Sequence, residues 1–439
     1  MSIKANEFVQ WFRSAAPYIH SHRGKTFVLH FGGELVDSPV FPHLVHDIAL
    51  LNNLGIRLVL VYGARPQIEF QLKENGIKPV LVSGLRLTDE TALDVVKQVV
   101  GALRIQIEAM FSMGLPNSPM AEAKIKVTSG NFITARPIGI INGVDLQFTG
   151  VVRRVDTDLI HGNLQNHEIV LIPPIGYSPT GEAFNMSSVE VATQIAISLR
   201  ADKLLFLSSE NGFKDESGKI IQHLSHYDAH QLLQGKDMTE GSPYLQLYSG
   251  LLASEKGVGR VHFIDQFEDG SLMLELFSRD GIGTMLSAAP FDNLRQATIE
   301  DIGGILELVQ PLEEEGILVR RSREKMEMEI TDYSVLIRDG AVIACAALHI
   351  YEDENAAELA CLVVQESYQK MSRGEELLLK AESDAQNRGV KKMFVLTTHA
   401  THWFLEQGFV EGKVDDLPVK KKELYNYQRN SKVLIKNLN

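Results

Sequence analysis

Short apolar segments that alternate with helical patterns most strongly limit the folds open to the first part of this chain. Amphipathic helical patterns lie between them, of which SSVEVATQIAISLRA is the clearest. The apolar segments are TFVLHF, RLVLVYG, NFITARPIG, EIVLIPPIG, KLLFLS and RVHFID. Strands that are apolar on both faces are typical of parallel sheets covered by helices on each side. The pattern therefore predicts an α/β domain over 1–287, with an amphipathic helix at 6–22 before the first strand.

A second pattern follows a segment at 288–294 that we interpret as a linker. From 295 to 439, helical patterns at 298–310 and 373–388 occur among segments typical of strands. Those segments are YSVLIRDG, AVIACAALHI, AAELACLVV, KKMFVLTT and SKVLIKNL. Several antiparallel strands interrupted by a helix that follows a glycine-bearing loop predict an α+β domain. We therefore expect two domains joined by a short linker.

Composition excludes several classes of partner. The formal charge of −13 disfavours nucleic acid and anionic membranes, because both require a basic protein surface. The one basic run, Lys420–Lys422, has acidic neighbours and is interpreted as solvated surface. The two cysteines, Cys345 and Cys361, lie in apolar runs, which indicates buried thiols in a reducing compartment and no metal centre. With no signal-peptide pattern and no apolar stretch of membrane-spanning length, we expect a cytoplasmic protein.

The segment ACLVVQESYQKMSRGEELLLKAESDAQNRG carries the strongest chemical signal in the second domain. A strand that ends near Val364 leads into a polar loop, and a helix then opens at Arg373 and Gly374. Free N–H groups at a helix N-terminus carry partial positive charge that suits a pyrophosphate, and Arg373 would add a direct charge. A plain helix cap gives the same pattern, so both interpretations stay open on the pattern alone.

This loop and the segment TTHATHWFLEQGF resemble the acetyl-CoA-binding motifs of the GNAT acyltransferases. Further segments resemble the bacterial N-acetylglutamate synthases, which join an amino-acid-kinase-like domain to a GNAT domain. Those segments are RDGIGTML, PLEEEGILVRRSRE, SRGEELL, VLTTHATHWF and LYNYQRNSKVL. The resemblance implies an amino-acid-kinase-like parallel-sheet sandwich followed by an α+β GNAT domain. It also implies transfer of an acetyl group from acetyl-CoA to the α-amine of L-glutamate, the first step of arginine biosynthesis.

The same resemblance suggests roles for residues in the second domain. Glu358 matches the general base; a carboxylate in an apolar strand is costly unless it is paired or functional, although an edge-strand glutamate facing water is the alternative. Strict alternation would place Glu358, Ala360 and Leu362 on one face of the strand, with Leu359 and Cys361 on the other. Thr397 matches the acid for the leaving thiolate, with positioning or a water relay as equal alternatives. The residues matched to acetyl-CoA are Cys361, Leu362, Val363, Gln369, Ser372, Arg373, Gly374 and Glu375, mainly through backbone groups.

Glutamate carries two carboxylates, and arginine binds a carboxylate through a bidentate fork. The family places substrate contacts at positions that match Arg321, Arg429 and Ser431. A solvated face is the alternative interpretation of Arg320, Arg321 and Arg323, but a second basic cluster at a matching position favours a substrate site.

In the first domain, the segments FGGE, VYGARPQI, SGNFITARPIG and GEAFNMSSVEVATQIA resemble N-acetylglutamate kinase, but that enzyme's phosphate-handling groups find no match. The kinases have a lysine where this chain has His30, and a glycine-rich turn where it has Gly63, Ala64 and Arg65. Phosphoryl transfer depends on such positioned cations and backbone donors, so we predict a catalytically silent domain.

The segment RVHFIDQFEDGSLMLELFSRDGIGTML resembles the part of arginine-sensitive relatives that binds the end product. The residues matched to an allosteric L-arginine site are Tyr18, Lys203, His262, Glu275, Gly281 and Gly283. An ordinary helix before a glycine turn would give the same segment. The family further suggests a homo-oligomer, a hexamer, consistent with the apolar face of the helix at 6–22. A working kinase with a GNAT appendage and a non-catalytic amino-acid sensor are the competing interpretations.

Overall fold

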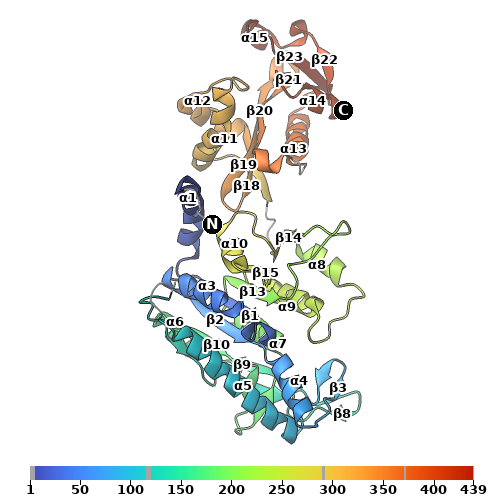
Figure 1. Cartoon of the computed structure of the whole chain (residues 1–439). Coiled ribbons are helices and arrows are strands. Elements are labelled where there is room, and N and C mark those ends of the chain that lie inside the picture. Colours follow the sequence, from blue (N-terminus) through green and yellow to red (C-terminus); the bar gives the residue numbers. More distant parts are fainter. Residues whose placement is uncertain (1–4, 115–119, 289–291, 370–371, 439) are drawn as a thin grey trace. The chain divides into compact units, whose positions relative to one another are not determined.

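The computed structural model describes residues 5–114, 120–288, 292–369 and 372–438 of the chain (Figure 1). The chain separates into two compact units, Met1–Ala289 and Pro290–Asn439. Each unit has its own sheets and its own hydrophobic clusters, and each is described by itself below.

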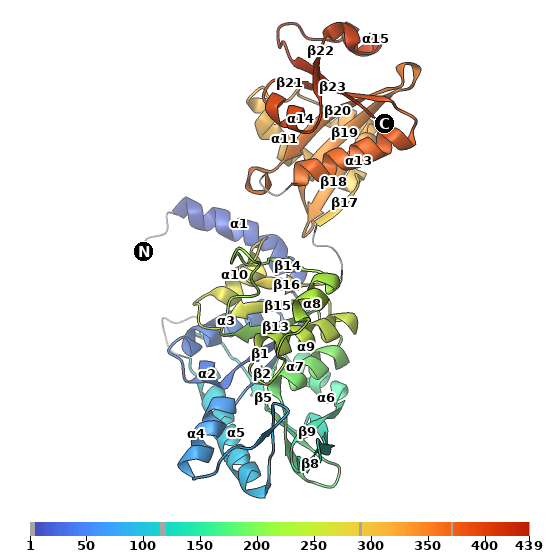
Figure 2. The ribbon, with the colours of Figure 1, turned by 90° about the vertical axis from the view of Figure 1, so that its right-hand side faces the viewer.

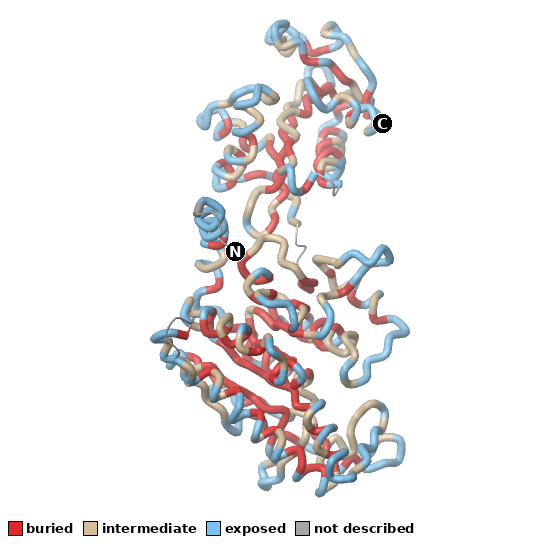
Figure 3. Tube along the Cα trace, viewed as in Figure 1, coloured by how far each residue is buried: buried red, intermediate tan, exposed pale blue. Residues whose placement is uncertain are grey.

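The first unit is built on an eight-stranded sheet, as the apolar segments predict. In spatial order its strands are β14 (His223–Leu224), β16 (Thr284–Leu286), β15 (Arg260–Asp265), β13 (Lys203–Ser208), β1 (Thr26–Phe31), β2 (Arg57–Tyr62), β10 (Ile169–Ile172) and β5 (Val127–Thr128). All pairings are parallel except that between β15 and β16. Every residue of β1 and β10 is buried, which is why these strands read as continuous apolar runs (Figure 3).

Helices cover both faces of this sheet and bury two separate hydrophobic clusters. On one face lie α1 (Ala5–His22), α2 (Gly33–Val36), α3 (Phe41–Asn53), α4 (Arg65–Glu74), α5 (Glu90–Phe111) and α10 (Ser271–Phe277). On the other lie α6 (Thr157–Gln165), α7 (Ser188–Ser198), α8 (His226–Leu233) and α9 (Pro243–Glu255). The α/β sandwich expected from the sequence is therefore confirmed.

One apolar segment differs from its expected place. NFITARPIG supplies β6 (Ile133–Pro137) to a separate four-stranded sheet, where Arg136 and Pro137 are exposed. That sheet also contains β12 (Ala183–Asn185), β11 (Ile175–Tyr177) and β9 (Gly150–Val155). Two short hairpins, β3 (Leu81–Val82) with β4 (Leu85–Arg86) and β7 (Ile140–Ile141) with β8 (Val144–Asp145), complete the unit. Burial of only one strand face distinguishes β6 from the strands of the main sheet.

The second unit contains a seven-stranded mixed sheet with helices on both faces (Figure 2). Its strands in spatial order are β17 (Asp292–Gln296), β18 (Tyr333–Arg338), β19 (Ala341–Tyr351), β20 (Ala356–Val364), β21 (Lys392–Thr397), β23 (Lys432–Asn437) and β22 (Val410–Gly412). Its helices are α11 (Ile302–Glu314), α12 (Arg323–Met328), α13 (Arg373–Asn387), α14 (Thr401–Glu406) and α15 (Val419–Glu423). The predicted apolar face of α13 lies in one cluster, whereas α11 and α12 contribute to another.

The segment 288–294, interpreted as a linker, partly belongs to this sheet. Residues 289–291 lie outside the described residues, but β17 begins at Asp292 and pairs antiparallel with β18 through Gln296. The strand is polar and half-exposed at the sheet edge, so it lacks the apolar pattern that identified the other strands. No helix in the described ranges is both long and apolar enough to cross a membrane.

Candidate functional site

Two adjacent parallel strands of the second unit separate at the centre of the sheet. β20 pairs with β21 only from Ala356 to Glu358, although β20 continues to Val364. β21 instead pairs with β23 along its whole length. Beyond Glu358, the edge of β20 that faces β21 thus has no strand partner among the described residues. Such unpaired backbone groups can bind an extended ligand as a neighbouring strand would.

A β-bulge in the same part of β20 changes which side chains share a face. The register with β19 shifts between Cys345 and Ala347, and Cys361 has a φ of +51°. Leu362 consequently packs in the cluster that contains Leu359, whereas Cys361 packs in the opposite cluster. The expectation that Leu362 shares the face of Glu358 is therefore wrong, because strict alternation ends at the bulge.

Glu358 is buried and paired. Its Oε1 lies 2.6 Å from Lys421 Nζ, and its Oε2 accepts a 3.3 Å hydrogen bond from Tyr351 Oη. Burial, followed by the nearby Glu358 carboxylate, raises the pKa of Tyr351. The interpretation of Lys420–Lys422 as solvated surface is wrong for Lys421, whose side chain is 23% exposed. The alternative of an edge-strand glutamate facing water is likewise wrong, because β20 is a central strand.

Thr397 ends β21 and caps the turn into α14. Its Oγ1 accepts hydrogen bonds from the N–H groups of Ala400 at 3.0 Å and His399 at 3.4 Å. These contacts hold the hydroxyl oxygen in place and leave its proton available to another acceptor. The geometry is compatible with both a positioning role and a proton-donating role.

The N-terminus of α13 is shaped by a left-handed residue and a close helix contact. Ser372 is the N-cap with a φ of +55°, and its hydroxyl makes no capping hydrogen bond in the described structure. A Cβ at Gly374 would lie 3.2 Å from the Trp403 ring, which accounts for glycine there. The described neighbour Gln369 donates to the carbonyl of Val364. No side chain caps the first turn of α13, so the N–H groups of this turn, including that of Glu375, are available to a ligand.

The guanidinium of Arg373 is paired within the unit. Its Nε and Nη2 lie 3.1 and 2.9 Å from Asp292 Oδ2, and it lies over the Tyr368 ring. The residue is buried. The expected phosphate contact of its charge stays a prediction, although the side chain is bound to Asp292 of β17. The backbone contact of Arg373 stays a prediction.

The structure brings both predicted substrate arginines to the segment between α11 and α12. Arg429 Nη2 donates to the carbonyl of Ile317, and the Arg321 backbone N–H donates to Glu313 at 3.1 Å. The Arg321 guanidinium donates to the Tyr333 hydroxyl. By contrast, the neighbouring Arg320 and Arg323 are exposed, and Ser431 is buried. One cation from each basic cluster is thus held inside the unit.

Two glycine turns lie close together in the kinase-like phosphate region of the first unit. A Cβ at Gly63 would lie 3.2 Å from Gly33 N and 3.3 Å from Ser188 Oγ. His30 Nε2 bonds Ser188 Oγ at 2.9 Å, and burial lowers the pKa of His30 to about 3. Arg65 is bound to Glu69 and to a backbone carbonyl. A neutral imidazole therefore stands at His30, and it supplies no positive charge for a transferred phosphate.

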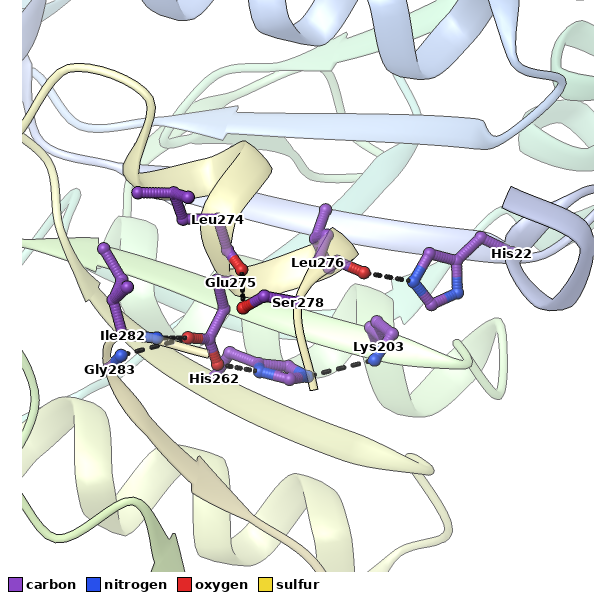
Figure 4. Close-up of polar contacts among 9 residues, drawn as sticks. All are labelled: His22, Lys203, His262, Leu274, Glu275, Leu276, Ser278, Ile282 and Gly283. Carbon is purple, nitrogen blue, oxygen red and sulfur yellow. Dashed lines mark hydrogen bonds and ion pairs between the residues drawn. The ribbon is translucent and has the colours of Figure 1, made fainter. Parts of the chain in front are cut away.

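Five of the six residues matched to an arginine site lie together between β13, β15 and α10 (Figure 4). His262 Nδ1 lies 2.6 Å from Glu275 Oε1, and Lys203 Nζ lies 3.2 Å from His262 Nε2. The other Glu275 oxygen accepts the N–H groups of Ile282 at 2.8 Å and Gly283 at 3.0 Å. Any Cβ at Gly281 would collide with the Glu275 carboxylate. Tyr18 lies against the ring of His22, which in turn bonds the Leu276 carbonyl of α10.

The charges of this cluster are fixed by its contacts. Burial raises the pKa of the Glu275 carboxyl, but hydrogen bonds from His262 and the two backbone N–H groups outweigh it and bring the pKa down to about 2. Burial and then the Lys203 ammonium lower the pKa of His262 to about 4, against the effect of Glu275. Near neutral pH the carboxylate is therefore ionised and the imidazole neutral, donating from Nδ1 and accepting at Nε2.

Comparison with known families agrees with this division. The model of the amino acid kinase family matches residues 25–265, and that of the GNAT acetyltransferase family matches residues 306–409. The fold and the site thus define a GNAT acetyltransferase joined to an amino-acid-kinase domain.

The relatives identify the particular family. The amino-acid acetyltransferase of Shewanella oneidensis is 50% identical over 436 residues, which cover 98% of each chain. That of Yersinia pseudotuberculosis is 48% identical and covers 100% of each chain. The crystal structure of N-acetylglutamate synthase from Neisseria gonorrhoeae, complexed with coenzyme A and L-arginine, has a TM-score of 0.89 and 37% identity, covering 98% of this chain and 99% of that one. The chain belongs to the amino-acid acetyltransferase family and is an amino-acid N-acetyltransferase.

Three residues at this site were not predicted from the sequence. Lys421 and Tyr351 hold Glu358, and Asp292 binds Arg373. Lys421 and Asp292 are distant along the chain from the residues they contact, whereas Tyr351 lies across the β19–β20 turn from Glu358. A buried carboxylate does require a partner, which was the available signal for a cation beside Glu358.

Proposed function

We propose that the chain transfers the acetyl group of acetyl-CoA to the α-amine of L-glutamate, giving N-acetyl-L-glutamate and coenzyme A. A second Neisseria gonorrhoeae N-acetylglutamate synthase structure, with a TM-score of 0.62 and 38% identity, is complexed with coenzyme A and N-acetylglutamate. The observation that carries the proposal is a buried carboxylate, Glu358, placed where β20 and β21 separate. A base beside an unpaired strand edge is the arrangement that acyl transfer to an amine needs.

The steps follow from the residues around this opening. Glu358 receives a proton from the substrate ammonium, directly or through water, and the amine attacks the thioester carbonyl. Backbone N–H groups at the bulge, from Cys361 to Val363, donate to the developing oxyanion. The carbon–sulfur bond then breaks, the nitrogen gives up its second proton to the thiolate, and Thr397 positions the thiolate or relays this proton to it. Arg321, Arg429 and Ser431 bind the two substrate carboxylates.

The same geometry suggests where the pantetheine and the pyrophosphate of acetyl-CoA bind. The free edge of β20 pairs with the pantetheine amides, and the first turn of α13, Ser372–Glu375, binds the pyrophosphate through its N–H groups. Gln369 contacts the cofactor beside this turn. The co-substrate is thus held mainly by backbone groups.

We further propose that L-arginine binds at the cluster around Glu275 and lowers turnover. A buried ionised carboxylate suits a guanidinium, and the relative with a TM-score of 0.89 is complexed with L-arginine. The neutral, buried His30 at the position of the kinases' lysine disfavours a working kinase. The first unit therefore serves regulation.

The exposed aromatic residues of α1, Phe8, Trp11 and Phe12, support a homo-oligomer, with a hexamer as the expected state. Light scattering at working concentration tests this, and the mass of one chain would contradict it. The two free thiols fit a reducing compartment such as the cytoplasm.

The experiment for the reaction is release of the coenzyme A thiol from acetyl-CoA, with and without L-glutamate and L-arginine. We expect release that depends on glutamate and falls as arginine is added. Release independent of glutamate, or none, contradicts the proposed reaction, and no release at all favours the sensor interpretation. Turnover of ATP in the same preparation would restore the kinase interpretation.

A further inference from the structure

Lys421 is the one lysine of its basic run that is turned toward the interior. Its side chain is 23% exposed, whereas Lys420 is exposed and Lys422, 44% exposed, pairs with Asp415. The helix that carries all three, α15, is fixed to the β19–β20 turn by a hydrogen bond from Val419 N to Glu354 at 3.1 Å. Three adjacent residues of the same type thus have three different environments.

The contact of Lys421 is with the carboxylate placed at the chemical step. Its Nζ lies 2.6 Å from Glu358 Oε1, while the other oxygen has only the longer 3.3 Å hydrogen bond from Tyr351. His349 pairs opposite Glu358 across the strands, but its ring bonds Asp332 at 3.1 Å. Within the described chain, Lys421 supplies the one ion pair of Glu358. The two carboxylate oxygens are therefore unequal.

We propose that Lys421 is a positioning residue for the acetyl transfer, holding Oε1 of Glu358 so that Oε2 receives the proton of the substrate ammonium. This inference rests on the proposed role of Glu358 as the base. Lys421 keeps its own proton throughout, so the transfer remains from the substrate nitrogen to Oε2, with attack on the thioester and loss of the thiolate unchanged. Its task is to fix one rotamer of a buried carboxylate.

The place of Lys421 in the chain links the base to the substrate cations. The segment 419–431 carries Lys421 at one end and Arg429 and Ser431 at the other. Between them, Tyr425 donates a 2.7 Å hydrogen bond to the carbonyl of Ser431 and packs in the cluster that contains Phe394. One short segment therefore positions both the carboxylate that takes the proton and the groups proposed to hold the substrate.

The test is a set of methionine variants at the three lysines, with kcat and KM measured for both substrates. We expect Lys421→Met to lower kcat roughly tenfold to hundredfold, a part of the ~10²- to 10⁴-fold that a general base contributes. Lys420→Met and Lys422→Met retain the wild-type kcat. Lys421→Arg, which keeps a cation, recovers part of the loss. Thermal melting confirms that each variant is folded.

A double-mutant cycle separates positioning from a structural effect. If Lys421 acts through Glu358, adding Lys421→Met to Glu358→Gln lowers kcat no further than Glu358→Gln alone. A wild-type kcat for Lys421→Met, or losses that multiply in the double variant, would overturn the proposal. Glutamate turnover by the wild-type enzyme tests the reaction itself, so these two failures are distinguishable.

Discussion

Glu275 in the first unit and Glu358 in the second are both buried carboxylates, yet their surroundings differ. Glu275 has hydrogen bonds on both oxygens, from His262 and from two backbone N–H groups. Glu358 has one short ion pair and one long hydrogen bond. A carboxylate saturated with donors is held ionised and suits recognition of a cation, whereas one with a weakly held oxygen leaves that oxygen open to a substrate group. Burial of a carboxylate therefore does not by itself identify a general base.

The largest effect that tests this comparison is on turnover. Glu358→Gln keeps the size of the side chain and removes the base, so we expect kcat to fall by about 10² to 10⁴. The exposed Glu352→Gln is the matched control and should leave kcat unchanged. Steady-state release of coenzyme A measures both. A Glu358→Gln enzyme within twofold of wild type would show that Glu358 is no base.

The second prediction concerns the response to arginine. Glu275→Gln removes a charge-assisted contact worth about 1.5–3 kcal/mol, so the arginine concentration for half-maximal effect should rise roughly tenfold to hundredfold. Turnover without arginine should be retained. The exposed Glu268→Gln provides the control. An unchanged arginine titration of Glu275→Gln would remove this carboxylate from the ligand site.

A third prediction uses two glycines on either side of α10. Gly281 has a φ of +62°, and a Cβ there would lie 2.9 Å from Glu275 Cδ, whereas Gly270 has a φ of +77° with nothing within 4 Å. Both alanine variants carry backbone strain of about 1–2 kcal/mol. Gly281→Ala should lose more stability in urea denaturation and also weaken arginine binding. Equal losses for the two variants would show that Glu275 is not held against this turn.

The last prediction is a pH dependence of stability from His30. Burial lowers its pKa in the folded protein to about 3, below the ordinary value of 6.5. The unfolded chain therefore binds more protons below pH 6.5, and stability is lost as pH falls, by up to about 1.4 kcal/mol per pH unit. His30→Gln, which keeps a hydrogen-bonding group for Ser188, should show a shallower loss between pH 6.5 and 4. If urea denaturation shows the same loss of stability with falling pH in both proteins, a neutral buried His30 is contradicted.

Local periodicity was sufficient to predict most of the architecture. The buried strands β1 and β10 read as continuous apolar runs, and α13 shows its apolar face and its Gly389 stop. Glu358 was identifiable because a single carboxylate interrupts an apolar strand. The polar edge strand β17 was missed because backbone hydrogen bonds to β18 stabilise it, and such bonds leave no apolar pattern in the sequence.

The rest depends on contacts between distant residues or on backbone angles. The bulge at Cys361 follows from a left-handed φ at a residue type that rarely adopts it, so the face of Leu362 was predicted incorrectly. The pairing of Arg373 with Asp292 and of Lys421 with Glu358 joins segments far apart in the chain. The charge of a residue does not identify its partner, and Lys421 was assigned to the solvated surface for that reason.

The central claim is that Glu275 and Glu358 have separable roles, and calorimetric titration of the Glu358→Gln protein with L-arginine tests it most directly. We expect arginine to bind with the affinity of the wild-type protein although turnover of glutamate is lost. Loss of arginine binding in this variant would contradict the claim, because it would make the two carboxylates parts of one site.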